Sequence, residues 1–160
     1  MDEMEVRLER LETMRAFYAH SGGENPEEEA MAKVRSWAEP RELLDVPGAR
    51  LFGRNTYPTT NPEPHGYEFY LTVGPDVEAG GGLEIREVPG GLYAVLRFKG
   101  LERITEAWGR IHAWVEESEY ENIDWVKGEH GWSLGYEEHL NPGEESLSEW
   151  VFDLWVQLKE

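Results

Sequence analysis

Apolar and charged residues alternate along short segments of the chain, and two of these segments share one pattern. VRLERL (6–11) and LEIREV (83–88) both alternate in the way that is typical of a half-buried strand. Each is followed by a second segment with strand-like composition, MRAFYAH (14–20) and LYAVLRF (92–98). The pattern therefore predicts a pair of strands at the start of each half of the chain.

Both strand pairs are followed by a segment whose apolar residues lie on one face of an amphipathic helix. The inward positions, at the same spacing in both halves, are Ala30, Met31, Val34, Trp37 and Ala38, and then Ala107, Trp108, Ile111, Trp114 and Val115. Asn25 followed by Pro26 predicts the beginning of the first helix, because asparagine caps helices and proline suits their first position.

Two further strand-like segments follow each helix, so the order of elements repeats. RLFGRNTY (50–57) is similar to SLGYEEHL (133–140), and YEFYLTV (67–73) matches FDLWVQL (152–158) in its order of aromatic, acidic and apolar residues. We therefore predict an α+β fold, a tandem duplication of a ββαββ (βαββ-type) module. Each module has an antiparallel sheet and one main helix, and a cleft lies between the modules. The modules are 5–74 and 83–159, and 74–82 is the linker.

In the final strand of each module, alternate side chains point to opposite faces. The apolar face, expected to pack on the helix, carries Phe69, Leu71, Val73, Leu154, Val156 and Leu158. The opposite face carries Glu68, Tyr70, Thr72, Asp153, Trp155 and Gln157. An acid beside a large aromatic residue, twice over, suits a hydrophobic cation, which gains from cation–π contact and from a counter-charge. Packing of Tyr70 and Trp155 between the modules explains the same pattern, and both interpretations stay open.

The alternation also assigns faces to the segment GYEEHLNP (135–142). It predicts that Tyr136 faces the helix and that Glu137 points the other way, towards a ligand or towards solvent at a strand edge. Glu138 is then in phase with the core face, near the end of the strand. In LYAVLRF the same argument places Tyr93 on the face opposite the core.

The charge of the chain limits its partners. It has 33 acidic and 15 basic residues, a formal charge of −18, and no cysteine. Such a charge repels nucleic acid and anionic membranes and favours cationic partners, although it also serves solubility. No segment is apolar enough for a signal peptide or a membrane span, so we expect a cytoplasmic protein. We expect no cofactor and no metal, because Glu137 and Glu138 point to opposite faces and form no ligand set with His130 and His139.

Several segments in this order resemble the GyrI-like family, also called the bacterial transcription-activator effector-binding domain. They are WAEP, ARLFGRNTYPTTNPEPHGYEFYLTV, VPGGLYAVLRFKG, EAWGRIHAWVEESEY and GYEEHLNP. The resemblance covers 1–160 as a single effector-binding domain and leaves no room for the helix-turn-helix of the family's regulators. It implies a cleft that binds hydrophobic, often cationic molecules, with Glu137 as the central charged residue among aromatic residues. Arg54 and Asn55 depart from the apolar or aromatic residues of many relatives.

The first functional hypothesis is a binding protein that senses, sequesters or detoxifies lipophilic cations. Its expected ligand-binding residues are Glu137, Trp155, Tyr70, Tyr93, Glu68 and Asp153. The resemblance also implies two alternatives. One is a hydrolase of strained, cyclopropane-bearing alkylating agents with Glu137 as its catalytic base. The other is an inhibitor or protector of DNA gyrase. A separate regulator is a further possible protein partner, and we expect no direct binding of nucleic acid or membrane.

Overall fold

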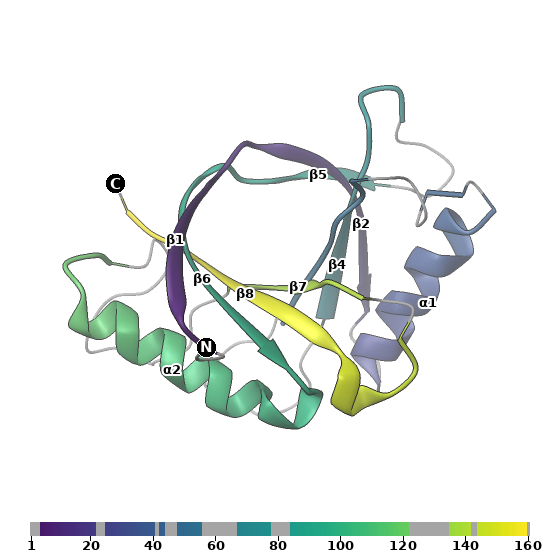
Figure 1. The fold of residues 1–160 in the computed structure, drawn as a ribbon. Coiled ribbons are helices and arrows are strands. Elements are labelled where there is room, and N and C mark those ends of the chain that lie inside the picture. The colour runs from purple at the N-terminus through teal and green to yellow at the C-terminus, as the bar shows by residue number, and fades with distance from the viewer. Residues whose placement is uncertain are drawn as a thin grey trace. The chain divides into compact units, whose positions relative to one another are not determined.

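The computed structural model of the chain describes residues 4–21, 25–40, 42–43, 48–55, 67–77, 84–121, 135–141 and 144–159. Within these ranges it contains two α-helices and eight β-strands, so the predicted α+β class is confirmed. The chain divides into two compact units (Figure 1). We name them the terminal unit, Met1–Glu12 with Gly90–Glu160, and the central unit, Thr13–Pro89.

The terminal unit is an antiparallel sheet with one helix packed on one of its faces (Figure 1). Its elements are β1 (Val6–Leu11), β6 (Gly91–Lys99), η1 (Leu101–Arg103), α2 (Ile104–Glu117), β7 (Tyr136–His139), η2 (Leu147–Glu149) and β8 (Val151–Gln157). The strand order is β1-β6-β8-β7. All five inward residues predicted for α2 belong to the core or pack against it, so the amphipathic stripe is confirmed. The core between α2 and the sheet includes Ala94, Leu96, Leu154, Val156 and Leu158.

The central unit has the same composition of elements, one helix on an antiparallel sheet. Its elements are β2 (Met14–Ser21), α1 (Pro26–Ala38), β3 (Leu51–Asn55), β4 (Tyr67–Thr72) and β5 (Glu84–Val88), and its strand order is β3-β4-β2-β5. The helix begins where it was predicted, directly after Asn25. Three glutamates in its first turn lie at the positive end of the helix dipole, where negative charge is stabilising. The core under α1 includes Phe17, Ala30, Val34, Trp37, Phe69 and Leu71.

The pairing of strands groups the elements differently from the modules 5–74 and 83–159. β1 pairs with β6, with Val6 opposite Leu96, and β5 pairs with β2, with Val88 opposite Met14. Each unit therefore holds an outer strand from the other predicted module. Local alternation identifies a strand but not its partner, because pairing is decided by contacts distant in the sequence. Residues 78–83, which include most of the predicted linker, lie outside the described ranges.

Candidate functional site

The sheet face of the terminal unit that is turned away from α2 carries both acids and aromatic rings. We name it the terminal acid–aromatic face. Residues directly opposite each other on neighbouring antiparallel strands share a face of the sheet. Tyr93 of β6 is opposite Gln157 of β8. Trp155 of β8 is opposite Val95 of β6 on one side and Tyr136 of β7 on the other. By the same registers the face holds Arg7, Glu9, Tyr93, Val95, Arg97, Tyr136, Glu138, Asp153, Trp155 and Gln157. The predicted faces of Tyr93, Asp153 and Trp155 are therefore those of the structure.

Glu137 lies on the opposite face of the sheet, which corrects the prediction. It is paired with Leu154 of the helix-side core, and its carboxylate accepts a hydrogen bond from the indole N–H of Trp108 in α2 at 2.9 Å. Tyr136 and Glu138 consequently occupy the acid–aromatic face. The alternation within β7 was right, but the two faces were exchanged, because alternation gives only relative phase.

Gly135 shows why the faces are arranged in this way. A Cβ atom at Gly135 would lie 2.6 Å from the carbonyl oxygen of Trp155 and 3.0 Å from the Trp108 ring. The position that α2 approaches must therefore be small. Glycine fills this requirement, and the large Tyr136 side chain is directed to the other face.

The terminal acid–aromatic face combines a buried carboxylate with two aromatic rings. Glu138 is 5% exposed and accepts a hydrogen bond from the indole N–H of Trp155 at 3.0 Å. The ring of Trp155 meets the ring of Tyr93 edge to face, with centroids 5.6 Å apart. A carboxylate held beside aromatic π-systems is an arrangement that suits an organic cation.

Asp153, on the same face, is held in an ion-pair network. The guanidinium of Arg97 donates two hydrogen bonds to its carboxylate, at 2.9 and 3.1 Å, and Arg7 donates one at 3.0 Å. This hydrogen bonding raises the pKa of Arg97 above its usual value. Asp153 is 2% exposed, so the two arginines offset the cost of burying its charge.

The central unit has a second face of this kind, which we name the central acid–aromatic face. Glu68 and Tyr70 lie on it, as predicted, and the registers add Tyr18, Phe52, Arg54, Glu84 and Arg86. Glu68 is buried and accepts hydrogen bonds from Arg54 Nε at 2.5 Å and from the Tyr70 hydroxyl at 2.7 Å. Burial, together with a hydrogen bond to Glu68, raises the pKa of Tyr18 to about 12.

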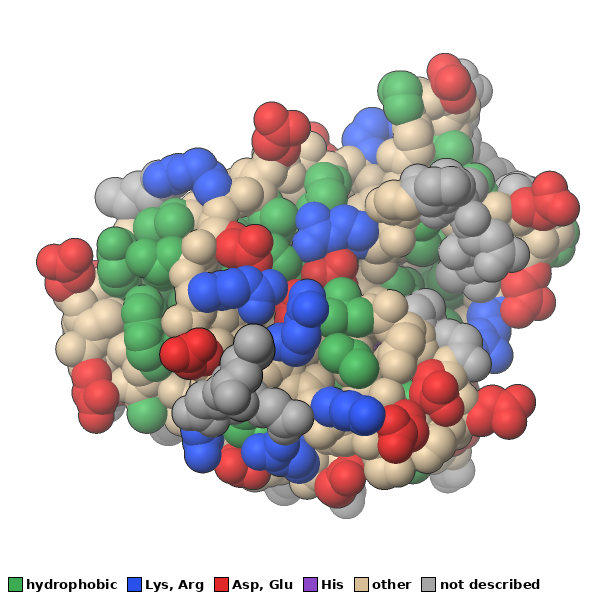
Figure 2. Space-filling view, in the orientation of Figure 1, with side chains coloured by type: hydrophobic (Ala, Val, Ile, Leu, Met, Phe, Trp, Pro, Cys, Tyr) green, Lys and Arg blue, Asp and Glu red, His purple; other side chains and the backbone are tan. Residues whose placement is uncertain are grey.

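Arginine side chains cover aromatic rings in the central unit. The guanidinium carbon of Arg86 lies 3.7 Å from the centroid of the Tyr18 ring. The corresponding distances are 5.0 Å for Arg50 over Phe52 and 6.0 Å for Arg54 over Tyr70. Figure 2 shows basic side chains lying among acidic ones on the face that it displays, so the negative charge of the chain is not uniform over that surface.

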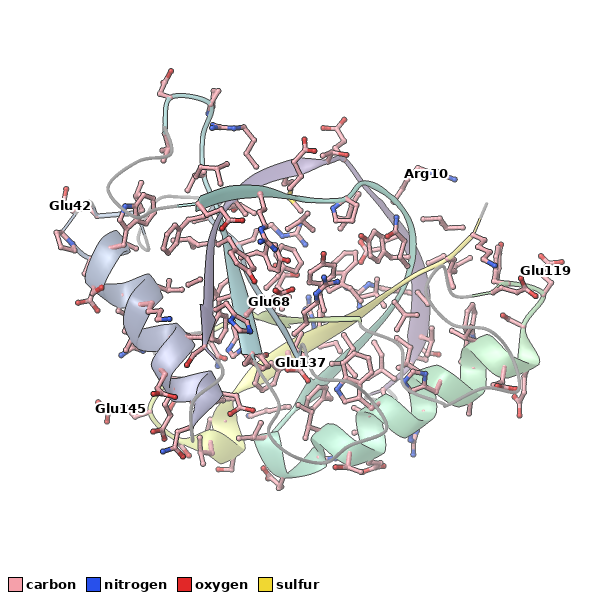
Figure 3. All side chains as sticks on the ribbon, turned by 180° about the vertical axis from the view of Figure 1, so that it is seen from behind. Arg10, Glu42, Glu68, Glu119, Glu137 and Glu145 are labelled. Atoms are coloured by element: carbon pink, nitrogen blue, oxygen red, sulfur yellow. The ribbon has the colours of Figure 1, made fainter. Side chains whose placement is uncertain are left out.

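The structure thus separates the six predicted site residues by face. It brings Trp155, Tyr93 and Asp153 together in the terminal unit and Glu68 with Tyr70 in the central unit, while Glu137 lies on the helix side of its sheet. Figure 3 shows Glu68 and Glu137 surrounded by side chains, whereas Glu42, Glu119 and Glu145 project outward.

The prediction did not single out Tyr18 or Arg86, and it placed Glu138 in phase with the core face. The alternation of MRAFYAH contained a signal for Tyr18, because Phe17 and Ala19 belong to the core and leave Tyr18 opposite. The place of Arg86 on this face follows only from the register of β5 with β2.

Among the residues that the structure describes, no group of three or more His, Cys, Asp or Glu side chains could hold a metal, and His130 lies outside them. Neither of the described helices is long and apolar enough to cross a membrane.

The fold, with one helix on each antiparallel sheet, defines the chain as a small α+β domain. Residues 4–159 match the GyrI-like family, described as a GyrI-like small molecule binding domain. This match covers nearly the whole chain, so the protein belongs to the GyrI-like family, and the resemblance seen in the sequence is confirmed. A comparison with curated proteins found no match.

Solved structures with the same fold come from proteins of different kinds. EcmrR in its complex with DNA has a TM-score of 0.70 at 14% identity, and the match covers 98% of this chain and 57% of that chain. A hydrolase from Listeria innocua has a TM-score of 0.70 at 9% identity, with 99% and 94% covered. SAV2435 bound to tetraphenylphosphonium has a TM-score of 0.56 at 12% identity, with 98% and 94% covered. At these identities the likeness concerns the fold alone, and this chain spans little more than half of the EcmrR chain.

Proposed function

We propose that this GyrI-like domain binds lipophilic cations on the terminal acid–aromatic face. Glu138 supplies the counter-charge, and Trp155 and Tyr93 supply the aromatic contact. The observation that carries the proposal is the buried Glu138 carboxylate, fixed by the Trp155 indole N–H 3.0 Å away, with the Tyr93 ring packed edge to face on Trp155. The biological role is sensing, sequestration or detoxification of such compounds.

Two physical effects favour a cation on this face. A cation on an aromatic ring gains about 0.5–2 kcal/mol, with the larger values where water is excluded. A charge-assisted contact with a buried carboxylate is stronger than a neutral one, because the surroundings screen it less than water does. The solved complex of SAV2435 with tetraphenylphosphonium supports this class of ligand, since that protein shares the fold.

Glu137 remains the glutamate that the family resemblance favours, and it gives a matched control for Glu138. The two residues are adjacent, both are buried, and each accepts a hydrogen bond from a tryptophan indole. They differ in the face of the sheet to which they belong. A comparison of their glutamine variants therefore tests the face as well as the charge.

The experiment measures the affinity of wild type, Glu138→Gln and Glu137→Gln for tetraphenylphosphonium by isothermal titration calorimetry. Triphenylphosphine oxide serves as a neutral aromatic ligand. Glu138→Gln should weaken cation binding about tenfold or more, a change of about 1.4 kcal/mol, with little effect on the neutral ligand. Glu137→Gln should have the smaller effect. A loss confined to Glu137→Gln would assign the charge to Glu137, and no loss in either folded variant would remove both glutamates from the site.

A hydrolase is the second candidate, and one observation favours it. The Glu137 carboxylate is buried and oriented by the Trp108 indole, as a general base that takes a proton from an attacking water needs to be. A hydrolase from Listeria innocua shares the fold. Turnover of cyclopropane-bearing alkylating agents that disappears in Glu137→Gln would support this activity, and equal rates with and without the protein would exclude it for those substrates.

The other expectations from the sequence stay predictions. They are the tandem duplication with its cleft, a cytoplasmic location, a protein partner such as gyrase or a separate regulator, and no direct binding of DNA. A gel shift at low salt tests the last of these, because electrostatic attraction to DNA is strongest there.

A further inference from the structure

The central acid–aromatic face already holds a cation that belongs to the chain. The guanidinium carbon of Arg86 lies 3.7 Å from the centroid of the Tyr18 ring, which is a close cation–π contact. The Arg86 Nε also pairs with the carboxylate of Glu84, two residues earlier in β5. In the register of β5 with β2, Glu84 is directly opposite Tyr18, so ring and carboxylate lie on the same face.

A second aromatic ring and a buried carboxylate complete this arrangement. Tyr70 is opposite Tyr18 on the other neighbouring strand, and the two rings have centroids 5.3 Å apart. The Tyr70 hydroxyl donates a hydrogen bond at 2.7 Å to Glu68, which is buried, and Glu68 contributes to the raised pKa of Tyr18. The Arg86 guanidinium thus lies against the Tyr18 ring and the exposed Glu84, with Tyr70 and the buried Glu68 on the same face. Aromatic residues beside acids are typical of sites for organic cations.

Arg86 is held more weakly than the other arginine that pairs with an acid of this face. Its side chain is 46% exposed and that of Glu84 is 53% exposed, and exposed ion pairs contribute little to stability. Arg54 instead donates to Glu68, whose side chain is 4% exposed, so removing Arg54 would leave a buried charge without its cation. Arg86 can therefore leave the face at small cost, and Arg54 cannot.

We propose that the central acid–aromatic face is a second site for organic cations, and that Arg86 is a resident competitor which an incoming cation displaces from Tyr18. The ligand class is a cation with a delocalised or quaternary charge, such as a quaternary ammonium or a phosphonium. Arg86 then determines specificity, because only a cation that binds the ring and acids better than a guanidinium replaces it. This inference rests on the proposed function, because it assumes that the domain binds organic cations. It depends on Arg86 and Tyr18, whereas the proposed function depends on Glu138 and Trp155.

The test compares Arg86→Gln with Arg35→Gln, measuring affinity and stoichiometry for tetraphenylphosphonium by calorimetry. Arg35 is exposed in the last turn of α1, so its variant removes the same charge without touching the face. Arg86→Gln should bind about tenfold more tightly, or gain a second binding event, because the competitor is gone. Arg35→Gln should show only the small effect of one lost positive charge. An affinity and stoichiometry in Arg86→Gln equal to those of Arg35→Gln would overturn the proposal.

A double variant shows whether the gain depends on the aromatic ring. Tyr18→Leu combined with Arg86→Gln should lose the added affinity, whereas Tyr18→Phe with Arg86→Gln should keep most of it, because the ring remains. If the added affinity for the phosphonium persists in the Tyr18→Leu double variant, it does not depend on the Tyr18 ring, and the proposal is contradicted. If the leucine variant does not fold, the comparison of Arg86→Gln with Arg35→Gln decides alone.

The two proposals fail in different ways. If wild type binds the cation, Glu138→Gln weakens it and Arg86→Gln changes nothing, the resident-cation proposal is wrong and the proposed function stands. If Arg86→Gln strengthens binding and Glu138→Gln has no effect, the central face is the site and the terminal one is not. If none of the folded proteins binds the phosphonium, both proposals are wrong for this ligand class.

Discussion

Glu137 and Glu138 are adjacent in β7, point to opposite faces of the sheet, and each accepts a hydrogen bond from a tryptophan indole. Trp108 of α2 donates to Glu137 at 2.9 Å, and Trp155 of β8 donates to Glu138 at 3.0 Å. One dipeptide thereby joins the helix to the sheet and places a carboxylate on the aromatic face. Glu137 thus contacts the helix that packs on the sheet, whereas its neighbour Glu138 is the candidate ligand contact on the other face.

The first prediction concerns the bond between Trp155 and Glu138. Trp155→Phe keeps a ring but removes the N–H donor, so a buried carboxylate loses a hydrogen bond. We expect the free energy of unfolding to fall by about 1–3 kcal/mol in urea titrations. Adding Glu138→Leu should recover part of this loss, because the carboxylate is then absent. Strictly additive effects of the two changes would show that the bond contributes no stability.

The second prediction ranks the two arginines that bind Asp153. Arg97 donates two hydrogen bonds to the buried carboxylate and Arg7 donates one. Arg97→Met should therefore lower the free energy of unfolding by about 1–3 kcal/mol, and Arg7→Met by less. Both are measured by urea unfolding at the same ionic strength. Equal losses, or a larger loss for Arg7→Met, would contradict the ranking.

The third prediction tests the close packing of β8 and α2 against Gly135. Gly135→Ala puts a Cβ 2.6 Å from a backbone oxygen, so strand or helix must shift, at a cost of about 1–3 kcal/mol. Gly109→Ala is the matched control, because Gly109 lies within α2 with no atom within 4 Å of the added Cβ. Alanine should stabilise the helix there by about 0.5–1 kcal/mol. Thermal unfolding of both variants should therefore shift in opposite directions.

The parts of the fold that depend on local pattern were predicted from the sequence. Both helical stripes were right because the inward residues, such as Val34 and Ile111, follow from helical spacing alone. The core face of β8 was right because Leu154 and Val156 are plainly apolar there.

The parts that depend on distant contacts were not predictable in this way. The pairing of β1 with β6 joins segments far apart in the chain, and no local feature of either names its partner. In β7 neither face is plainly apolar, and the sequence pattern wrongly predicts that Tyr136 faces the helix. Only its register with Trp155 shows that it lies on the acid–aromatic face.

The last prediction is a loss of stability at acid pH that originates in His139. The ring of His139 packs edge to face on Phe152, with centroids 4.7 Å apart, and burial lowers the pKa of His139 to about 4. Because the unfolded chain has the ordinary histidine pKa of about 6.5, only the unfolded state takes up this proton as pH falls from 6.5 to 4. The contribution of His139 to the free energy of unfolding is constant above this pH window. Within the window it decreases, by at most about 2 kcal/mol at pH 5. Urea unfolding at pH 7 and pH 5 should therefore show a smaller decrease in His139→Asn than in wild type. An equal decrease in both proteins would mean that other groups, such as carboxylates, cause the whole pH dependence.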